Sequence, residues 1–448
     1  MGICRITALL LLLAAPAGAQ QLTIQGDRFA VDGTPRFLTV ITYFGAMGAL
    51  DAAADLQFLH DAGFDGARIW PNSPDGPTLM RADGSLDPDA LSRLTFILDR
   101  AREQRLIVDV SFTAEQIDGL DAARFQTAIA AAARALASYD NILFDIQNER
   151  DVYGPFGRPL AATDVAAIAA AIKRITPSRV VTASNAPGTT PSAAAQFTAD
   201  TGLDVTAYHD DRVPDWYDRN RLAPIVAAMK ANGRPAYLQE PSRFPFPSTD
   251  RADYFRLARA NAKRLGAAGW CYHTDLGFNL RLARFRDLLQ SRQEPDWAFV
   301  TSLVARIHVQ TSDAHFVTAE GGGGSAVHAD RRQAGEWETF VVVPRDGGPV
   351  LDGDRVTIGT SDGRHFLQAA AGGGDLLTAA GAAPGPWETF TIDTGSGGPI
   401  ADGDQVRLRT TGDPAWFVSA DAGGGGLVYV NRRSAGAWET FLLRLVGF

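Results

Sequence analysis

The sequence predicts a two-part fold: an α/β domain built as a (β/α)8 (TIM) barrel, followed by an all-β domain of the β-trefoil type. Buried-strand and amphipathic-helix patterns alternate through residues 37–289. Two short apolar strands in that region end on carboxylates, Glu149 and Glu240. A Gly-rich C-terminal region repeats one motif three times. A chain of 448 residues is also too long for one hydrophobic core, which agrees with two domains.

Residues 1–19 have the features of an export signal. Arg5 supplies a positive charge, and residues 8–15 are apolar without a charged residue. Ala17-Gly-Ala19 is a small-residue cleavage site. The apolar run is too short to cross a bilayer, and no other run is long enough. We therefore expect a signal peptide and a secreted or periplasmic protein.

The composition argues against several classes of partner and cofactor. The net charge of −9 becomes −10 when Arg5 is removed, which disfavours nucleic acid and anionic membranes. Only Cys271 remains once Cys4 is removed, so no intrachain disulfide is expected. One cysteine and seven histidines do not support a thiol-based metal site. We expect no metal or other cofactor, and the sequence gives no oligomeric state.

The first domain is expected at residues 20–298. Residues 22–35 alternate apolar and polar around two turns, which predicts a hairpin that plugs the barrel floor. The predicted strands cover 37–43, 66–70, 106–112, 142–148, 179–184, 204–208, 236–240 and 268–272. The predicted helices cover 50–62, 88–104, 122–137, 164–175, 192–199, 219–232, 250–265 and 282–289. A doubly wound open sheet is the alternative, but no Gly-rich dinucleotide turn follows the first strand.

Polar and aromatic side chains gather at the predicted strand ends, where a barrel carries its chemistry. The strand at 142–148 is apolar through Phe144 and Ile146, and then meets Asn148 and Glu149. A second strand ends on Glu240, 91 residues later. Two carboxylates on different strands are what glycoside cleavage requires. The candidates for contact with substrate are Arg68, Trp70, Asn148, Tyr208, His209, Trp270 and His273.

Residues 20 to about 295 resemble the clan A glycoside hydrolases, closest in pattern to family 5. The resemblance rests on the hairpin at 29–35, Gly66-Ala-Arg-Ile-Trp70, Gln147-Asn-Glu149, Tyr208-His209, Glu240 and Trp270. It implies that Glu149 is the acid/base and Glu240 the nucleophile of a retaining enzyme. It also implies that Asn148 holds the sugar 2-hydroxyl, that Arg68 keeps Glu240 ionised, and that His209 or Tyr208 orients Glu240.

The sequence departs from the family pattern in three places, which leaves the exact family and the substrate open. Arg150 follows Glu149 where a proline is usual, the sixth strand reads Tyr-His-Asp-Asp, and His273 lies close to Trp270. Several candidates also have structural alternatives. Arg68 could be an internal ion pair, His209 a core histidine, and the two tryptophans core filling. We interpret Asp109 and Asp145, which lie within strands, as members of a buried polar network.

The second domain is expected at residues 303–448. Gly-x-Trp-Glu-Thr-Phe ends at Phe340, Phe390 and Phe441, and three repeats of about four strands predict a β-trefoil. The poly-Gly runs predict hairpin turns with positive φ. The domain resembles the fascin-like trefoils, similar to glucan-binding bacterial modules. Strand alternation places each motif tryptophan opposite the core, which predicts glycan-binding pairs, with core tryptophans as the alternative. These pairs are Trp337 and Glu338, Trp387 and Glu388, and Trp438 and Glu439.

Together these features predict a secreted retaining glycoside hydrolase whose partner is a β-linked polysaccharide or oligosaccharide. The trefoil resemblance favours a β-glucan, while mannan, xylan and galactan stay open. A non-catalytic carbohydrate-binding protein and a transglycosylase that uses the same glutamates are the alternatives.

Overall fold

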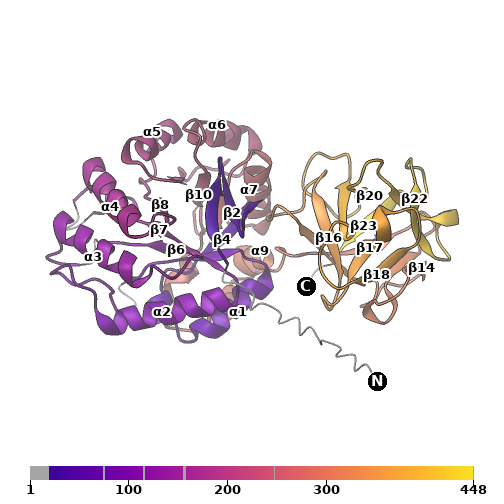
Figure 1. Cartoon of the computed structure of the whole chain (residues 1–448), viewed down its shortest axis with the longest axis horizontal. Coiled ribbons are helices and arrows are strands. Elements are labelled where there is room, and N and C mark those ends of the chain that lie inside the picture. Colours follow the sequence, from indigo (N-terminus) through magenta and orange to yellow (C-terminus); the bar gives the residue numbers. More distant parts are fainter. Residues whose placement is uncertain (1–19, 74–75, 115–116, 155–157, 247, 447–448) are drawn as a thin grey trace, which may run out of the picture.

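The computed structural model describes residues 20–446, except 74–75, 115–116, 155–157 and 247. The expected signal peptide, residues 1–19, lies outside the described residues. The described chain forms a helix-wrapped barrel and an all-β domain beside it (Figure 1). No helix in these ranges combines the length and apolarity needed to cross a membrane.

Eight parallel strands form the barrel sheet, as the alternating pattern predicts. They are β4 (Leu38–Thr42), β5 (Gly66–Ile69), β6 (Ile107–Ser111), β7 (Ile142–Asp145), β8 (Val180–Thr182), β9 (Thr206–His209), β10 (Ala236–Glu240) and β11 (Gly269–Tyr272). Their order is β8-β7-β6-β5-β4-β11-β10-β9. The Asp204 N–H donates to Val181 O at 2.9 Å, and Thr182 Oγ1 donates to Val205 O at 2.8 Å. β8 and β9 are the two ends of the strand order, so these bonds close the sheet into a barrel.

Helices cover the outer face of the barrel. They are α1 (Ala52–Ala62), α2 (Pro88–Glu103), α3 (Ala122–Ala135), α4 (Ala162–Ile175), α5 (Pro191–Thr201), α6 (Arg219–Met229), α7 (Ala252–Arg264), α8 (Phe285–Ser291) and the short α9 (Ala298–Val300). The helix at α5 has the least regular apolar pattern, and its ends are set by local signals. Thr190 accepts a bond from the Ala193 N–H, proline opens the first turn, and Gly202 ends the helix at φ 69°.

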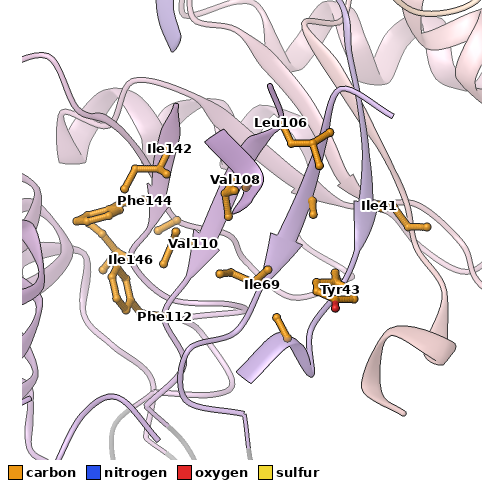
Figure 2. Packing of buried hydrophobic residues seen from close by; sticks show 14 of the residues in the cluster. Ile41, Tyr43, Ile69, Leu106, Val108, Val110, Phe112, Ile142, Phe144 and Ile146 are labelled. Carbon is orange, nitrogen blue, oxygen red and sulfur yellow. The ribbon is translucent and has the colours of Figure 1, made fainter. Parts of the chain in front are cut away.

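Outward-facing strand residues pack against these helices in one large core. Ile41, Ile69, Val110 and Phe144 belong to this core, and Figure 2 shows them projecting from neighbouring strands. Strand alternation sends the other residues of each strand into the barrel interior.

A three-stranded antiparallel sheet closes the barrel floor. It consists of β1 (Leu22–Gln25), β2 (Arg28–Val31) and β3 (Thr34–Arg36), so the predicted hairpin has a third strand. Leu22 and Phe29 pack with inward-facing residues of the barrel strands, such as Leu38 and Leu143. The predicted plug is therefore confirmed.

The all-β domain contains twelve described strands, four in each repeat. They are β12 (Ala305–Gln310), β13 (Phe316–Thr318), β14 (His328–Arg331), β15 (Phe340–Pro344), β16 (Arg355–Thr360), β17 (Phe366–Ala369), β18 (Leu377–Gly381), β19 (Thr389–Asp393), β20 (Gln405–Thr410), β21 (Phe417–Ala420), β22 (Val428–Arg432) and β23 (Phe441–Leu445). Antiparallel pairing joins β12, β15, β16, β19, β20 and β23 into a ring that returns to β12. The remaining strands form three hairpins, one per repeat.

The poly-Gly turns adopt positive φ, as predicted, and they connect the repeats. Gly323 has a φ of 110°, and a Cβ there would lie 2.8 Å from Cγ of His365 in the second repeat. Gly373 has a φ of 113°, and its Cβ would lie 2.6 Å from Cδ1 of Trp416 in the third repeat. Both the backbone conformation and the close packing therefore require glycine.

The β-domain docks at the amino ends of the barrel strands. Lys263 on α7 is buried, and its Nζ lies 2.7 Å from Asp354 Oδ2 and 2.8 Å from Asp346 Oδ1. The Phe37 N–H, just before β4, donates to Asp346 O at 2.6 Å. The contact lies near α7 and α9 in Figure 1. The carboxyl ends of the barrel strands are thus at the opposite end from this junction.

Candidate active site

Glu149 and Glu240 meet at the carboxyl end of the barrel. Glu149 follows β7, and Glu240 is the last residue of β10. One oxygen of each carboxylate and one ring nitrogen of His209 all lie within 4.8 Å of one another. The two glutamates, separated by 91 residues, therefore form one site, which is the geometry the sequence predicted.

A β-bulge turns Glu240 into the barrel. In the pairing with β9, Leu238 lies opposite Tyr208, but Glu240 lies opposite His209, so β10 has one extra residue. Regular alternation would send Gln239 inward and Glu240 outward. The bulge gives both side chains contacts in the barrel interior: Gln239 contacts Asp109, and Glu240 contacts Arg68. Bulges often serve this purpose beside active sites.

Glu149 lies in a left-handed backbone conformation. Its φ is 47°, which is uncommon for a residue with a side chain. Its N–H donates to Ser184 Oγ at 3.0 Å, and the next N–H, of Arg150, donates to Ser184 O at 3.0 Å. The end of β8 thus holds this conformation and sets the direction of the carboxylate. Such conformations are concentrated at functional sites.

Arg68 holds Glu240 as an anion. Its Nη1 lies 2.5 Å from Glu240 Oε1, and its Nη2 donates to Asn148 Oδ1 at 2.7 Å. Burial opposes ionisation of Glu240, but His209, His273 and Arg68 outweigh it and hold its pKa well below the usual range. The contact agrees with the role that the family resemblance implies for Arg68.

A buried polar network lies beneath this pair, as interpreted from the sequence. Arg68 Nη2 donates to Asp145 Oδ2 at 3.1 Å, and Arg68 Nε lies 3.6 Å from Asp109 Oδ2. Burial raises the pKa of Asp109 to about 6, because Arg68 offsets it only in part and Asp145 adds repulsion. Gln239 Nε2 donates to both aspartates at 2.9 Å. The Arg68 guanidinium is therefore shared among Glu240, Asp145 and Asp109.

His209 lies between the two glutamates. Its Nδ1 is 3.0 Å from Glu149 Oε1 and 3.6 Å from Glu240 Oε2, and its Nε2 is 3.1 Å from Gln239 Oε1. Burial by itself would lower the pKa of His209, but Glu240 and the bond to Glu149 raise it above its ordinary value. The resemblance implies that His209 orients Glu240, whereas its shorter contact here is with Glu149.

His273 and Trp70 border the same site. His273 Nε2 lies 3.7 Å from Glu240 Oε2, and burial lowers the pKa of His273 to about 3, so the ring is neutral at pH 7. Trp70 is partly exposed and packs against Phe44 at 4.2 Å between ring centroids. Phe44 in turn contacts the His273 ring at 6.0 Å. These residues form an aromatic wall beside Glu240.

Two predicted substrate contacts are corrected by the structure. Trp270 is 1% exposed and packs against Phe299 at 5.6 Å, on the helix side of β11. Tyr208 belongs to the same outer core, on the strand face shared with Thr206, whose Oγ1 accepts a bond from Asn232. Both side chains therefore point away from the barrel interior, and the core alternative considered for Trp270 is correct.

The motif glutamates of the β-domain are also corrected, because they are buried. Glu338, Glu388 and Glu439 are 5–6% exposed. Glu338 accepts bonds from the Gly335 N–H at 2.7 Å and from Thr318 Oγ1 at 3.0 Å. The other two carboxylates accept bonds from the equivalent positions Gln368 and Ser419. Each glutamate stabilises its own repeat and is not available as an acceptor for sugar hydroxyls.

The motif tryptophans are on the surface, as strand alternation suggested. Trp337, Trp387 and Trp438 are 43%, 49% and 44% exposed. They lie in the turns before β15, β19 and β23, so the regular strand assumed in the sequence argument does not extend to them. The Phe340 ring that follows is in the core.

Sequence reasoning missed Gln239 and Phe44 as members of the site. A signal for Gln239 is present, because two polar residues end an otherwise apolar strand. Alternation allows only one of them to face inward unless the strand bulges. Phe44 gives no such signal, since it directly follows other apolar residues at the end of a buried strand.

Among the described residues, one cluster has the spacing to hold a metal ion, and it consists of Glu149, His209 and Glu240. Their other contacts favour proton transfer. Arg68 already neutralises Glu240 at 2.5 Å, and both ring nitrogens of His209 have hydrogen-bond partners. A general acid, a buried anion and an imidazole that contacts both are suited to acid/base and nucleophilic chemistry.

Comparisons with known proteins show the fold. No protein-family model and no curated protein matches the sequence. A solved structure described as a glycoside hydrolase aligns over 96% of this chain and 97% of its own, with 12% identity and a TM-score of 0.52. A β-mannanase from the blue mussel Mytilus edulis aligns over 61% of this chain and 97% of its own, with 15% identity and a TM-score of 0.44. A GH5_18 structure from Streptomyces cattleya in complex with GlcNAc aligns over 56% and 74%, with 19% identity and a TM-score of 0.43.

The first of these likenesses extends over almost the whole chain, through the barrel and the β-domain. The chain therefore has the overall fold of a solved structure described as a glycoside hydrolase.

Proposed function

We propose that the chain is a retaining glycoside hydrolase with Glu240 as nucleophile and Glu149 as acid/base. The observation that carries the proposal is the approach of the two carboxylates to within 4.8 Å, with Arg68 on Glu240 and His209 on Glu149. Retaining enzymes hold their two carboxyl groups roughly 5–5.5 Å apart, and inverting enzymes hold them further apart to admit a water molecule. The short separation supports retention.

The chemistry follows from the different partners of the two carboxylates. An oxygen of Glu240 forms a bond to the anomeric carbon as the bond from that carbon to the leaving oxygen breaks. The leaving oxygen takes the electron pair and a proton from Glu149. Water then attacks the anomeric carbon, gives its proton to Glu149 and releases Glu240. The low pKa of Glu240 supports its role as the anion in the first step.

The proposed substrate is a β-linked polysaccharide or oligosaccharide. Trp70 supplies a partly exposed aromatic ring in the wall beside Glu240, and such a ring can pack against the C–H face of a sugar. Asn148 directs its Oδ1 to Arg68, so its Nδ2 is the atom left to donate to a sugar. A β-glucan is tested first, with mannan, xylan and galactan beside it.

The β-domain is proposed to be a β-trefoil that attaches the enzyme to a glycan. A six-stranded ring with three hairpins and three repeats supports this fold. The three exposed tryptophans support binding, since weak sites on one polymer gain by avidity. The pattern of residues 1–19 supports export from the cytoplasm.

The test is hydrolysis of a panel of β-1,3-, β-1,4- and β-1,6-glucans, mannan, xylan and galactan, with product anomers followed by NMR. The wild-type chain should release products that keep the anomeric configuration. Glu240→Ala and Glu149→Ala should lose activity, while the exposed Glu103→Ala serves as a control. Binding without cleavage on all substrates would refute the hydrolase proposal, and inverted products would refute the assigned roles. Polymer products longer than the substrate would indicate transglycosylation.

A further inference from the structure

Gln239 connects two aspartates of the barrel interior to His209, which contacts both glutamates. It is fully buried, and it lies directly before Glu240 at the bulge in β10. Its Nε2 donates to Asp109 Oδ2 and Asp145 Oδ2, both at 2.9 Å. Carboxylate oxygens accept hydrogen bonds, so the amide nitrogen must be on this side. The orientation of the Gln239 amide is therefore fixed by the two aspartates.

This orientation determines which protons His209 carries. With the amide nitrogen facing the aspartates, the Gln239 oxygen faces His209 Nε2 at 3.1 Å. A carbonyl oxygen only accepts, so Nε2 must bear a proton. The other ring nitrogen, Nδ1, then faces Glu149 Oε1 at 3.0 Å. One further proton can lie between these two atoms, as an ion pair or as a neutral imidazole that accepts from a carboxylic acid.

We propose that Gln239 is a positioning residue that fixes His209 as an Nε2–H donor, so that His209 Nδ1 and Glu149 hold the catalytic proton between them. This inference rests on the proposed hydrolase function for its catalytic part. In the first step that proton leaves Glu149 for the departing oxygen, which takes the electron pair of the breaking bond. His209 keeps its Nε2 proton on the Gln239 oxygen, and the attacking water later returns a proton to the pair formed by Glu149 and His209 Nδ1 as Glu240 is released. No other reactant is required.

Charged groups around His209 act in both directions. Burial and Arg68 disfavour a protonated ring, while Glu240 and Glu149 favour it. Asp109 and Asp145 face the other side of the Gln239 amide. On the far side of Glu240, Arg243 and Arg212 act on His273, which is neutral. Deleting the Gln239 amide removes the acceptor of the Nε2 proton and keeps Glu149, Glu240 and Arg68, the charged groups that act on His209. The proton should then be lost from His209 at lower pH.

The first measurement compares substrates with poor and good leaving groups. Gln239→Leu should lower kcat/KM for an alkyl or sugar leaving group about tenfold more than for dinitrophenol, which departs without a proton. The basic limb of its pH profile should move to lower pH. Thr182→Val serves as a control for a general packing defect, because it removes a buried hydrogen bond of the barrel, from Thr182 Oγ1 to Val205 O, that does not involve His209. Equal losses on both substrates would overturn the proposal, since a general packing defect affects both.

The second measurement does not depend on turnover. Ring ¹⁵N NMR, with His209 assigned by its absence in His209→Asn, should show a protonated Nε2 across the titration of the wild-type chain. In Gln239→Leu the His209 titration should fall by about one unit, the size of a lost bond to a charged group. An unchanged titration in Gln239→Leu would overturn the proposal, even if the chain proved not to be a hydrolase.

If Gln239→Leu fails to fold, the ring ¹⁵N spectrum of the wild-type chain decides. A neutral His209 that carries its proton on Nδ1 would contradict the role of the Gln239 oxygen as acceptor.

Discussion

The guanidinium of Arg68 lies 2.5 Å from the carboxylate of Glu240, and both side chains are shielded from solvent by the barrel. The same guanidinium contacts Asp145 and Asn148. One buried cation therefore fixes the proposed nucleophile, the amide beside the proposed acid/base and an acid of the barrel interior. Stability and activity should be linked through this side chain.

Replacing Arg68 with methionine should destabilise the barrel and abolish activity. The change leaves Glu240 and Asp145 buried without their cation, and breaking a buried ion pair in this way costs about 3–5 kcal/mol. Urea unfolding measures the loss. Arg251→Met, which removes an exposed arginine paired with Asp253, should leave the transition unchanged. A fully stable Arg68→Met protein would contradict the network described above.

Glu240 should make the stability of the protein depend on pH in the acid range. Its pKa in the folded chain lies below the ordinary value of 4.5, so its contribution is complete above that pH and is lost as pH falls. The difference in free energy of unfolding between the wild-type chain and Glu240→Gln should therefore shrink from pH 6 to pH 3. Asp109, with a pKa raised to about 6, acts in the opposite direction, but it is present in both proteins. A constant difference over this range would show that Glu240 has an ordinary pKa.

The two tryptophans of the barrel should behave differently when changed. Trp70→Ala should raise KM for a glycan with little loss of stability, because the ring is partly exposed beside Glu240. Trp270→Ala should destabilise the barrel by about 3–5 kcal/mol, because it empties a buried site next to Phe299. Steady-state kinetics and urea unfolding on both variants separate the two effects. A KM change confined to Trp270→Ala would reverse the assignment.

Neighbouring residues of the β-domain motif should also separate binding from stability. Glu338→Ala should destabilise the domain by about 1–3 kcal/mol, because the Gly335 N–H and the Thr318 hydroxyl lose their acceptor. Trp337→Ala should leave the stability unchanged. Changing Trp337 together with Trp387 and Trp438 should lower the bound fraction in pull-down on insoluble glucan. Unchanged binding by that triple variant would exclude the tryptophan faces as the attachment site.

Lys263 should determine whether the two domains unfold together. Lys263→Met leaves Asp346 and Asp354 without their cation at the junction, so calorimetry should resolve two transitions where the wild-type chain has one. Lys230→Met removes the pair with Asp27 at the barrel surface and serves as the control. A single transition in Lys263→Met would show that the remaining contacts are sufficient.

The barrel could be predicted because its signals are local and periodic. Each buried strand is a short apolar run, each helix has an amphipathic repeat, and strand ends of a parallel barrel share one rim. These rules place Glu149 and Glu240 together without any knowledge of distances. They also give the inward face of β7, where Asp145 reaches Arg68.

Three side chains show where the rule that strand ends share one rim was not sufficient. The bulge in β10 turns Glu240 inward, and without it the sequence would place that side chain among the helices. Trp270 was expected at the site because it lies on the eighth strand and belongs to the family resemblance, yet regular alternation sends it to the opposite face from His273. Glu338 looked available because it lies beside an exposed tryptophan. Glu338 is buried against Thr318, which lies 20 residues earlier on β13 of the same repeat.

The contact between Lys263 and the β-domain also sets a direction for the enzyme on its substrate. Because that domain is fastened at the amino ends of the barrel strands, the catalytic mouth opens at the far end of the barrel from it. Under the proposed attachment, the segment of glycan held by the β-domain is separate from the segment that enters the mouth. An attached molecule would then cleave neighbouring strands and spare the segment that it holds.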